Sequence, residues 1–144
     1  QERHEWTVED EMEMVRTYLE IEKVRFSDKL EVKEEIEEAA RHYSIPRFLI
    51  QPLIENAIKH GIDLKVGGGV VFLEINKQDA KICITVENPG VINTDKSVGL
   101  GLKNLKKRLD IQYKGKASFS LITKENDSVV AEILIPMHIE DEKI

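Results

Sequence analysis

Apolar residues in the first part of the chain recur at three- and four-residue steps, the spacing of a helix with one buried face. They predict a helix over residues 8–26, and its buried face comprises Val8, Met12, Val15, Leu19 and Phe26. Thr7 stands just before this helix and Asp10 three residues later, which is the spacing of a capping box. Ser27 and Asp28 end the pattern, so we expect one capped helix here.

Several later segments alternate apolar and polar residues, which is typical of strands with one face on a core and one in water. Such alternation predicts strands over residues 30–36, 70–76 and 81–88, with a short turn at 77–80 between the last two. A further alternating stretch, residues 117–136, is interrupted by a polar turn and predicts a β-hairpin.

Residues 45–62 return to the helical spacing and carry an apolar stripe formed by Ile50, Leu53, Ile54, Ala57 and Ile58. Pro46 can open this helix, because a first-turn residue has no backbone hydrogen bond to lose. Pro52 lies deeper and would remove a hydrogen bond to Phe48, so we expect a kink or a start nearer Gln51. Gly61 is a candidate C-cap.

A last helical stretch is marked by Leu102, Leu105, Leu109 and Tyr113, and residues 137–144 form an acidic tail that we expect to be frayed. The element order is then αβαββαββ. One-faced strands joined by short turns favour a mixed, mostly antiparallel sheet with the helices packed on one face. The predicted fold class is therefore α+β, a two-layer sandwich.

Composition narrows the functional classes. The chain has 144 residues, enough for one domain with a sizeable core, and a net charge of −6 that argues against general nucleic-acid binding. A single cysteine, Cys83, excludes an intrachain disulfide and a thiolate zinc site, and its place in a strand favours a packed residue over a nucleophile. No apolar run approaches the ~20 residues of a membrane-spanning helix.

Three polar or glycine-rich features stand out against this apolar pattern. Glu55, Asn56, Lys59 and His60 lie on the side of the second helix away from its apolar stripe. Asn88-Pro89-Gly90 ends a strand, and Gly99-x-Gly101 opens the last helix. Glycines at a helix N-terminus let free N–H groups approach a polyphosphate, so together these features point to a nucleotide. Taken singly, each has a plainer interpretation, an i,i+4 ion pair of Glu55 with Lys59 and ordinary turns.

In this order the three features resemble the GHKL, or Bergerat-fold, ATPases, and most closely the catalytic ATP-binding domain of LytS/YpdA-type sensor histidine kinases. The stretch Pro46-x-x-Leu49-x-Gln51-Pro52-Leu53-x-Glu55-Asn56-Ala57-x-Lys59-His60-Gly61 is similar to the N box of that subfamily. The stretch Val98-Gly99-Leu100-Gly101-Leu102-x-Asn104-x-x-x-Arg108-Leu109 is similar to its second glycine box. The resemblance covers nearly the whole chain and implies a sandwich of the Bergerat type that binds ATP with Mg²⁺.

The resemblance also implies roles for the residues of the N box. Asn56 would place its amide oxygen on Mg²⁺, which keeps most of its water and takes few protein ligands. Glu55 would be the base that polarises the imidazole of a phosphoacceptor histidine. Lys59 and His60 would face phosphate or ribose.

Further residues would contact the nucleotide from the two glycine-containing turns. Asn88 stands where the family usually has an aspartate that accepts a hydrogen bond from the adenine amino group, and asparagine keeps the acceptor but loses the charge. Gly90 would let the backbone approach the base. Residues 91–98 would form a lid, and Gly99, Leu100, Gly101 and Leu102 would present the start of the last helix to the phosphates. The basic cluster Lys103, Lys106, Lys107 and Arg108 is expected on a solvated helix face, with a nucleotide or acceptor contact by Arg108 as the alternative.

The resemblance divides the chain into a linker helix, residues 1–28, and an ATP-binding catalytic domain, residues 29–144. None of His4, His42 and His138 stands in an acceptor motif, so the phosphoacceptor helix domain is expected upstream in the same parent protein. The expected partners are that domain and a cognate response regulator, in a parent that is a homodimer. The fragment would be a cytoplasmic part of an inner- or plasma-membrane sensor, with no membrane contact of its own.

Two other functions stay open. Asn88 in place of aspartate motivates a degenerate GHKL domain that acts as a protein-interaction module without turnover. The third hypothesis, after the histidine kinase and the interaction module, is a GHKL relative that phosphorylates serine on a regulator or that drives a clamp by ATP hydrolysis. The proline within the N box and the short lid favour the sensor kinases over this third group by resemblance alone.

Overall fold

A computed structural model of the chain describes residues 5–62, 68–90 and 100–137, and all statements below refer to these. Its helices are α1 (Val8–Phe26), α2 (Gln51–Ala57) and α3 (Leu100–Tyr113), with 3₁₀ turns at Ser27–Lys29 and Glu38–Ala40 and a π-helical turn at Ile58–Ile62. Its strands are β1 (Leu30–Ile36), β2 (Gly69–Gln78), β3 (Lys81–Pro89), β4 (Ser118–Lys124) and β5 (Ser128–Pro136). This order confirms the predicted sequence of elements.

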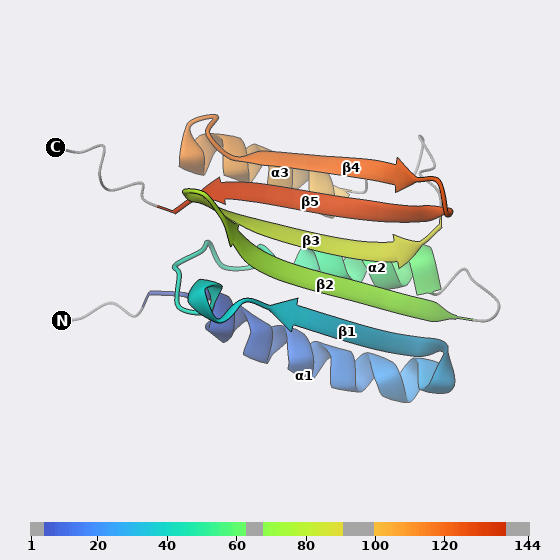
Figure 1. The fold of residues 1–144 in the computed structure, drawn as a ribbon. Coiled ribbons are helices and arrows are strands. Elements are labelled where there is room, and N and C mark those ends of the chain that lie inside the picture. Colours follow the sequence, from blue (N-terminus) through green and yellow to red (C-terminus); the bar gives the residue numbers. More distant parts are fainter. Residues whose placement is uncertain (1–4, 63–67, 91–99, 138–144) are drawn as a thin grey trace, which may run out of the picture.

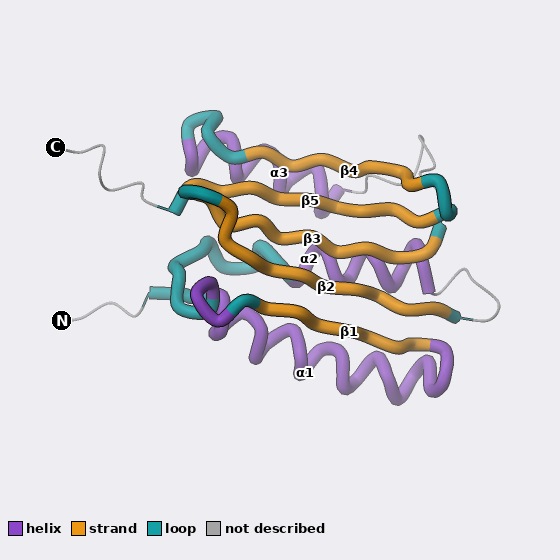
Figure 2. The backbone as a smooth tube through the Cα atoms, viewed as in Figure 1, coloured by secondary structure: helices purple, strands orange, loops and turns teal. Residues whose placement is uncertain are grey.

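The five strands form one sheet in the order β1-β2-β3-β5-β4. The pair β1 and β2 is parallel, and the other three pairs are antiparallel. All three helices lie behind one face of this sheet, with α2 between α1 and α3 (Figures 1 and 2). The predicted α+β sandwich with helices on one face is confirmed.

The core fills the space between the sheet and the helices. Alternate residues of β2 and β3 face it and are almost fully buried, namely Val71, Leu73, Ile75, Ile82, Ile84 and Val86. The stripe of α1 faces them, with Val8, Met12 and Val15 fully buried. None of the described helices lies on the opposite face of the sheet (Figure 1). There Cys83 is also buried, and its Sγ lies 3.7 Å from a carboxylate oxygen of Glu132, which agrees with a packed residue.

The sequence placed the ends of α1 and β1 correctly, and of its two expectations for α2 the start near Gln51 is confirmed. The capping box forms as predicted, since Thr7 Oγ1 accepts from Asp10 N and the Asp10 carboxylate accepts from Thr7 N. The helix does not open at Pro46; it begins at Gln51 with Pro52 in its first turn, where proline loses no hydrogen bond. Gly61 is not a C-cap, because it lies inside the π-helical turn that continues to Ile62.

No described helix is long and apolar enough to cross a membrane. The predicted lid at residues 91–98 and the tail at 138–144 lie outside the described residues. Met137, at the start of that tail, packs against the core.

Candidate nucleotide site

Two of the three sequence features meet at one edge of the sandwich, on the helix side of the sheet. They are the π-helical turn after α2 and the last residues of β3 (Figure 1). α3 runs antiparallel to α2 and packs against it, and its first turn lies beside α2, short of that edge. The topology thus brings two of the features that predicted a nucleotide into contact and places the third on the flank of α2.

The end of β3 provides a buried amide beside an open main-chain turn. Asn88 is 6% exposed and has the same strand parity as Val86 and Ile84, so its side chain points to the helix face. Its Nδ2 donates a hydrogen bond of 2.7 Å to the Pro89 carbonyl oxygen. That bond uses the donor end of the amide, and an exocyclic amino group would need the acceptor end.

Gly90 adopts φ of 133°, a conformation that residues with a Cβ rarely take. Its N–H donates to the Asp127 carbonyl oxygen at 2.8 Å, which ties the end of β3 to the β4–β5 turn. A Cβ added at Gly90 would lie 3.6 Å from the His60 carbonyl oxygen and 3.8 Å from Asn88 Nδ2. The glycine therefore leaves a small space between α2 and Asn88.

The polar residues of α2 divide between its two flanks. Glu55 is exposed and accepts a hydrogen bond of 3.0 Å from Gln51 Nε2. With Tyr18 and Arg25 of α1 it lines a cavity of about 330 Å³. Successive helical residues are turned by about 100°, so half-buried Asn56 projects away from α1 and toward the α3 flank. The adjacent side chains of Glu55 and Asn56 thus lie on two different flanks of α2.

His60 and Lys59 lie in the π-helical turn, a widened turn often found at functional sites. Lys59 is exposed, and His60 is half-buried. Burial lowers the pKa of His60 below its usual value, and the charge of Lys59 lowers it further. The imidazole is therefore neutral near pH 7 and can both donate and accept a hydrogen bond.

The predicted residues of the second glycine box are only partly described. Leu100 and Gly101 form the first turn of α3, Leu102 is buried against the core, and Gly99 lies outside the described residues. In the basic cluster, Lys103, Lys106 and Lys107 are exposed as expected. Arg108 instead donates to the carbonyl oxygens of Arg47 and Phe48, each at 2.6 Å.

Solved structures with a similar fold are catalytic parts of histidine kinases. The nucleotide-free catalytic domain of the histidine kinase ThkA superposes with a TM-score of 0.73 at 18% identity, covering 95% of this chain and 97% of that one. The Acinetobacter baumannii histidine kinase AdeS gives a TM-score of 0.70 at 16% identity over 94% of this chain and 67% of that one. This chain has the fold of a histidine kinase catalytic domain.

Sequence comparison finds relatives among larger proteins. The chain is 38% identical over 110 residues to the uncharacterised protein YwpD of Bacillus subtilis (strain 168), covering 69% of this chain. It is 28% identical over 113 residues to the sensor histidine kinase YesM of the same organism, covering 74% of this chain. It is 29% identical over 147 residues to the sensor protein kinase HptS of Staphylococcus aureus (strain USA300), covering 93% of this chain. The chain spans between 20% and 39% of the length of these relatives, and no family model matches it.

The residues of this histidine kinase fold suit ATP with Mg²⁺. Among residues 5–62, 68–90 and 100–137, no group of three His, Cys, Asp or Glu side chains could hold a metal ion. Mg²⁺ bound with a nucleotide needs no such group, because phosphates and water supply most of its ligands and one or two protein oxygens suffice. Asn56 carries an amide oxygen of this kind, and the amide of Asn88 carries an acceptor oxygen that could pair with the amino group of a base.

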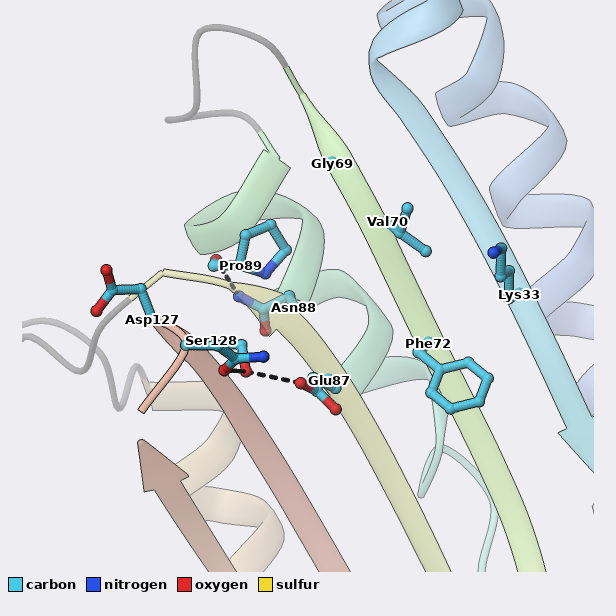
Figure 3. Close-up of a pocket in the computed structure, with 10 residues that line it drawn as sticks. Lys33, Gly69, Val70, Phe72, Glu87, Asn88, Pro89, Asp127 and Ser128 are labelled. Carbon is cyan, nitrogen blue, oxygen red and sulfur yellow. Dashed lines mark hydrogen bonds between the residues drawn. The ribbon is translucent and has the colours of Figure 1, made fainter. Parts of the chain in front are cut away.

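A second concavity of about 580 Å³ opens on the other side of β3 (Figure 3). It is lined by Phe72 and Glu87, which pair across β2 and β3, and by Ser128, whose Oγ donates to Glu87 Oε2 at 2.6 Å. Phe72 alternates with the buried residues of β2 and so faces away from the helices. Of the predicted site residues that the structure describes, only Asn88 lines this concavity. The concavity is therefore separate from the candidate site and lies on the other side of β3.

The sequence analysis missed one buried charged residue. Glu11 is fully buried in α1, where its carboxylate accepts hydrogen bonds from the backbone just before α2. One signal for it was available, since Glu11 is three residues after Val8 and four before Val15, within the apolar stripe. A carboxylate in that position has to be hydrogen-bonded to be tolerated.

Proposed function

We propose that this chain binds ATP with Mg²⁺ between α2 and the start of α3 and is the catalytic domain of a sensor histidine kinase. The observation that carries the proposal is the contact of His60 with Gly90 and Asn88 on the helix side of the sheet, beside a helix, α2, against which α3 also packs. The fold and the sequence relatives support the same function. The LytS/YpdA subfamily stays a prediction.

Each site residue has a proposed task that follows from its position. Asn88 would accept from the adenine amino group, and Gly90 would let the base approach the backbone. Lys59 and neutral His60 would contact phosphate or ribose. The free N–H groups of Leu100, Gly101 and Leu102 at the start of α3 would face the phosphates, and the resemblance gives Gly99 the same role. When bound, ATP and Mg²⁺ would supply the transferable γ-phosphoryl group and the positive charge that offsets its oxygens.

Glu55 and Asn56 would then act on different groups. Asn56, on the α3 flank, would hold Mg²⁺ through its amide oxygen. Glu55, on the α1 flank, would hydrogen-bond the imidazole of an acceptor histidine that enters from the α1 side. The histidine kinase ThkA in its complex with the response regulator TrrA has a similar fold, with a TM-score of 0.69 at 17% identity. By analogy we propose a response regulator as a partner of this chain. The acceptor domain would belong to the same parent protein. That parent would be a homodimeric membrane sensor, and this chain would be a cytoplasmic part of it.

Titration with a fluorescent ATP analogue, with Mg²⁺ and with EDTA, tests the proposal. Wild-type protein should bind, and more tightly with Mg²⁺. Asn56→Ala should abolish the Mg²⁺-dependent gain while circular dichroism shows an intact fold. Asn76→Ala is the matched control, because this half-buried asparagine lies on β2 and points to the open face of the sheet. No binding by the wild type, or an unchanged Mg²⁺ effect in Asn56→Ala, would contradict the proposal.

Asn88 keeps one alternative open, a degenerate domain that binds its partner without phosphotransfer. Mixing the chain with a separately prepared acceptor-helix domain and labelled ATP separates the two functions. Label on a histidine supports the kinase, whereas association that is independent of nucleotide supports the interaction module.

A further inference from the structure

The turn that enters α2 is held by side chains from both neighbouring helices. The Glu11 carboxylate of α1 accepts four hydrogen bonds there. Oε1 accepts from Trp6 Nε1 at 2.6 Å and from Phe48 N at 2.8 Å. Oε2 accepts from Ile50 N at 2.8 Å and from Gln51 N at 3.1 Å. Both oxygens are thus saturated, as a fully buried carboxylate requires.

The backbone is bent to present these donors. Phe48 has φ of 60°, which is uncommon for a bulky residue, and its side chain is 53% exposed. Burial of the ring therefore does not offset the strain. The left-handed residue turns the N–H groups of Phe48, Ile50 and Gln51 toward one point, where they bind an anion, here the carboxylate of Glu11. Strain held in this way marks a backbone position that the surrounding structure requires.

The carbonyl side of the same turn is held from α3. Arg108 Nη1 and Nη2 each donate a 2.6 Å hydrogen bond, to the carbonyl oxygens of Arg47 and Phe48. The Arg47 guanidinium in turn lies over the Trp6 ring, 4.4 Å from its centroid. The peptide groups entering α2 are therefore fixed on both sides.

The fixed turn lies close to the residues of the proposed site. Asn56 follows Gln51 by five residues, about 7.5 Å along a helix. Such a short helix has little freedom to correct a rotation or shift imposed at its first turn. We propose that Glu11 is a positioning residue for the nucleotide site, one that sets the rotation of α2 and hence the direction of Asn56 and His60. The expected effect of Glu11 on nucleotide binding rests on the proposed function, whereas its effect on the rotation of α2 does not.

The test compares Glu11→Gln with Glu13→Gln, a control on the exposed side of the same helix. Glutamine keeps the shape of Glu11 but replaces one acceptor oxygen by a donor, so two of the four hydrogen bonds are lost. In ¹⁵N-labelled protein without nucleotide, the side-chain signals of Asn56 and His60 should shift in Glu11→Gln. The side-chain amide of Asn88, which is on β3, should not. The gain in affinity for the fluorescent ATP analogue on adding Mg²⁺ should fall about tenfold, as for outer-shell residues of metal sites, with affinity in EDTA unchanged.

A merely stabilising role predicts a different result. Glu11→Gln would then melt at a lower temperature, with Asn56 signals and a Mg²⁺ effect equal to those of Glu13→Gln, and this would overturn the proposal. If Glu11→Gln does not fold, Trp6→Phe serves instead, because it removes a single donor to Glu11. It should shift the side-chain signals of Asn56 and His60 by less than Glu11→Gln would. Unshifted signals would refute the proposal. If the wild type binds no nucleotide, the proposed function fails, and the Asn56 and His60 signals alone decide whether Glu11 positions α2.

Discussion

At the end of β3, the main chain at Gly90 decides how closely a ligand can approach Asn88. A Cβ at Gly90 would touch nothing closer than 3.6 Å, so Gly90→Ala introduces conformational strain and not a clash. We expect it to lower the free energy of unfolding in urea by about 1–3 kcal/mol and to weaken binding of the ATP analogue. Gly115→Ala is the matched control, because Gly115 has φ of 81° with no atom within 4 Å and lies in the turn after α3. It should lose similar stability with unchanged affinity; equal affinity losses would argue against a role for Gly90 in binding.

His60 should give the fold a dependence on pH. Its pKa is lowered in the folded state, so between that pKa and the usual value of about 6.5 the unfolded chain binds more protons. The stabilisation by neutral His60 is complete above this window and is lost as pH falls through it. Melting temperatures measured from pH 7.5 to 5 should therefore fall more for the wild type than for His60→Gln. His42→Gln, at an exposed position, should follow the wild type; parallel curves for all three proteins would refute the assignment.

At this scale the sequence predicted residue types well and contacts poorly. Asn56, Asn88 and Gly90 stand out because amides and glycines are unusual where they occur. The contacts of Glu11 and Arg108 were not predictable, because each joins α1 or α3 to a turn about 40 or 60 residues away in sequence. Nor did the N-box motif indicate that Glu55 and Asn56 face different flanks, which follows only once α1 and α3 are placed on either side of α2.

Among the elements, α1 was predicted to the residue because its signals are local. The capping box acts within four residues, and Thr7→Ala removes the side-chain acceptor for Asp10 N. We expect a loss of about 1 kcal/mol in the free energy of unfolding, measured by urea denaturation. Thr17→Ala is the control, since exposed Thr17 bonds only to Glu13 of its own helix. A loss in Thr17→Ala as large as that in Thr7→Ala would contradict the capping role.

The bounds of α2 depended on tertiary contacts instead. Pro52 predicted either a kink or a start near Gln51, and local chemistry does not choose between these two. The hydrogen bonds to Glu11 do, because they fix residues 48–51 in a turn that delays the helix to Gln51. The π-helical turn at Ile58–Ile62 also escaped prediction, since a widened turn keeps its apolar residues, Ile58 and Ile62, buried.

For the whole molecule, the pattern of apolar residues predicted the layers but not the order of strands. Short turns indicate antiparallel neighbours, as in β2 with β3 and β4 with β5. The parallel pair β1 and β2 and the placement of β5 beside β3 join segments that are distant in sequence. Together with the packing of the helices, these pairings bring the end of β3 beside the turn that follows α2, so the candidate site is a product of topology.

The division of the chain at residue 28 is a prediction that deletion of α1 can test. The buried stripe of α1 belongs to the same core as the sheet, and burial of each large apolar side chain contributes about 1.5–3 kcal/mol. The whole stripe thus contributes about as much as the total stability of a small domain, about 5–15 kcal/mol. We expect residues 29–144 alone to show no cooperative thermal unfolding, and a peptide of residues 5–28 to restore it. A double variant, Ile21→Ala with Val24→Ala, is the control: these side chains are 65% and 85% exposed, so its melting temperature should stay near that of the wild type. A sharp transition in residues 29–144 alone would show that α1 is a separable linker after all.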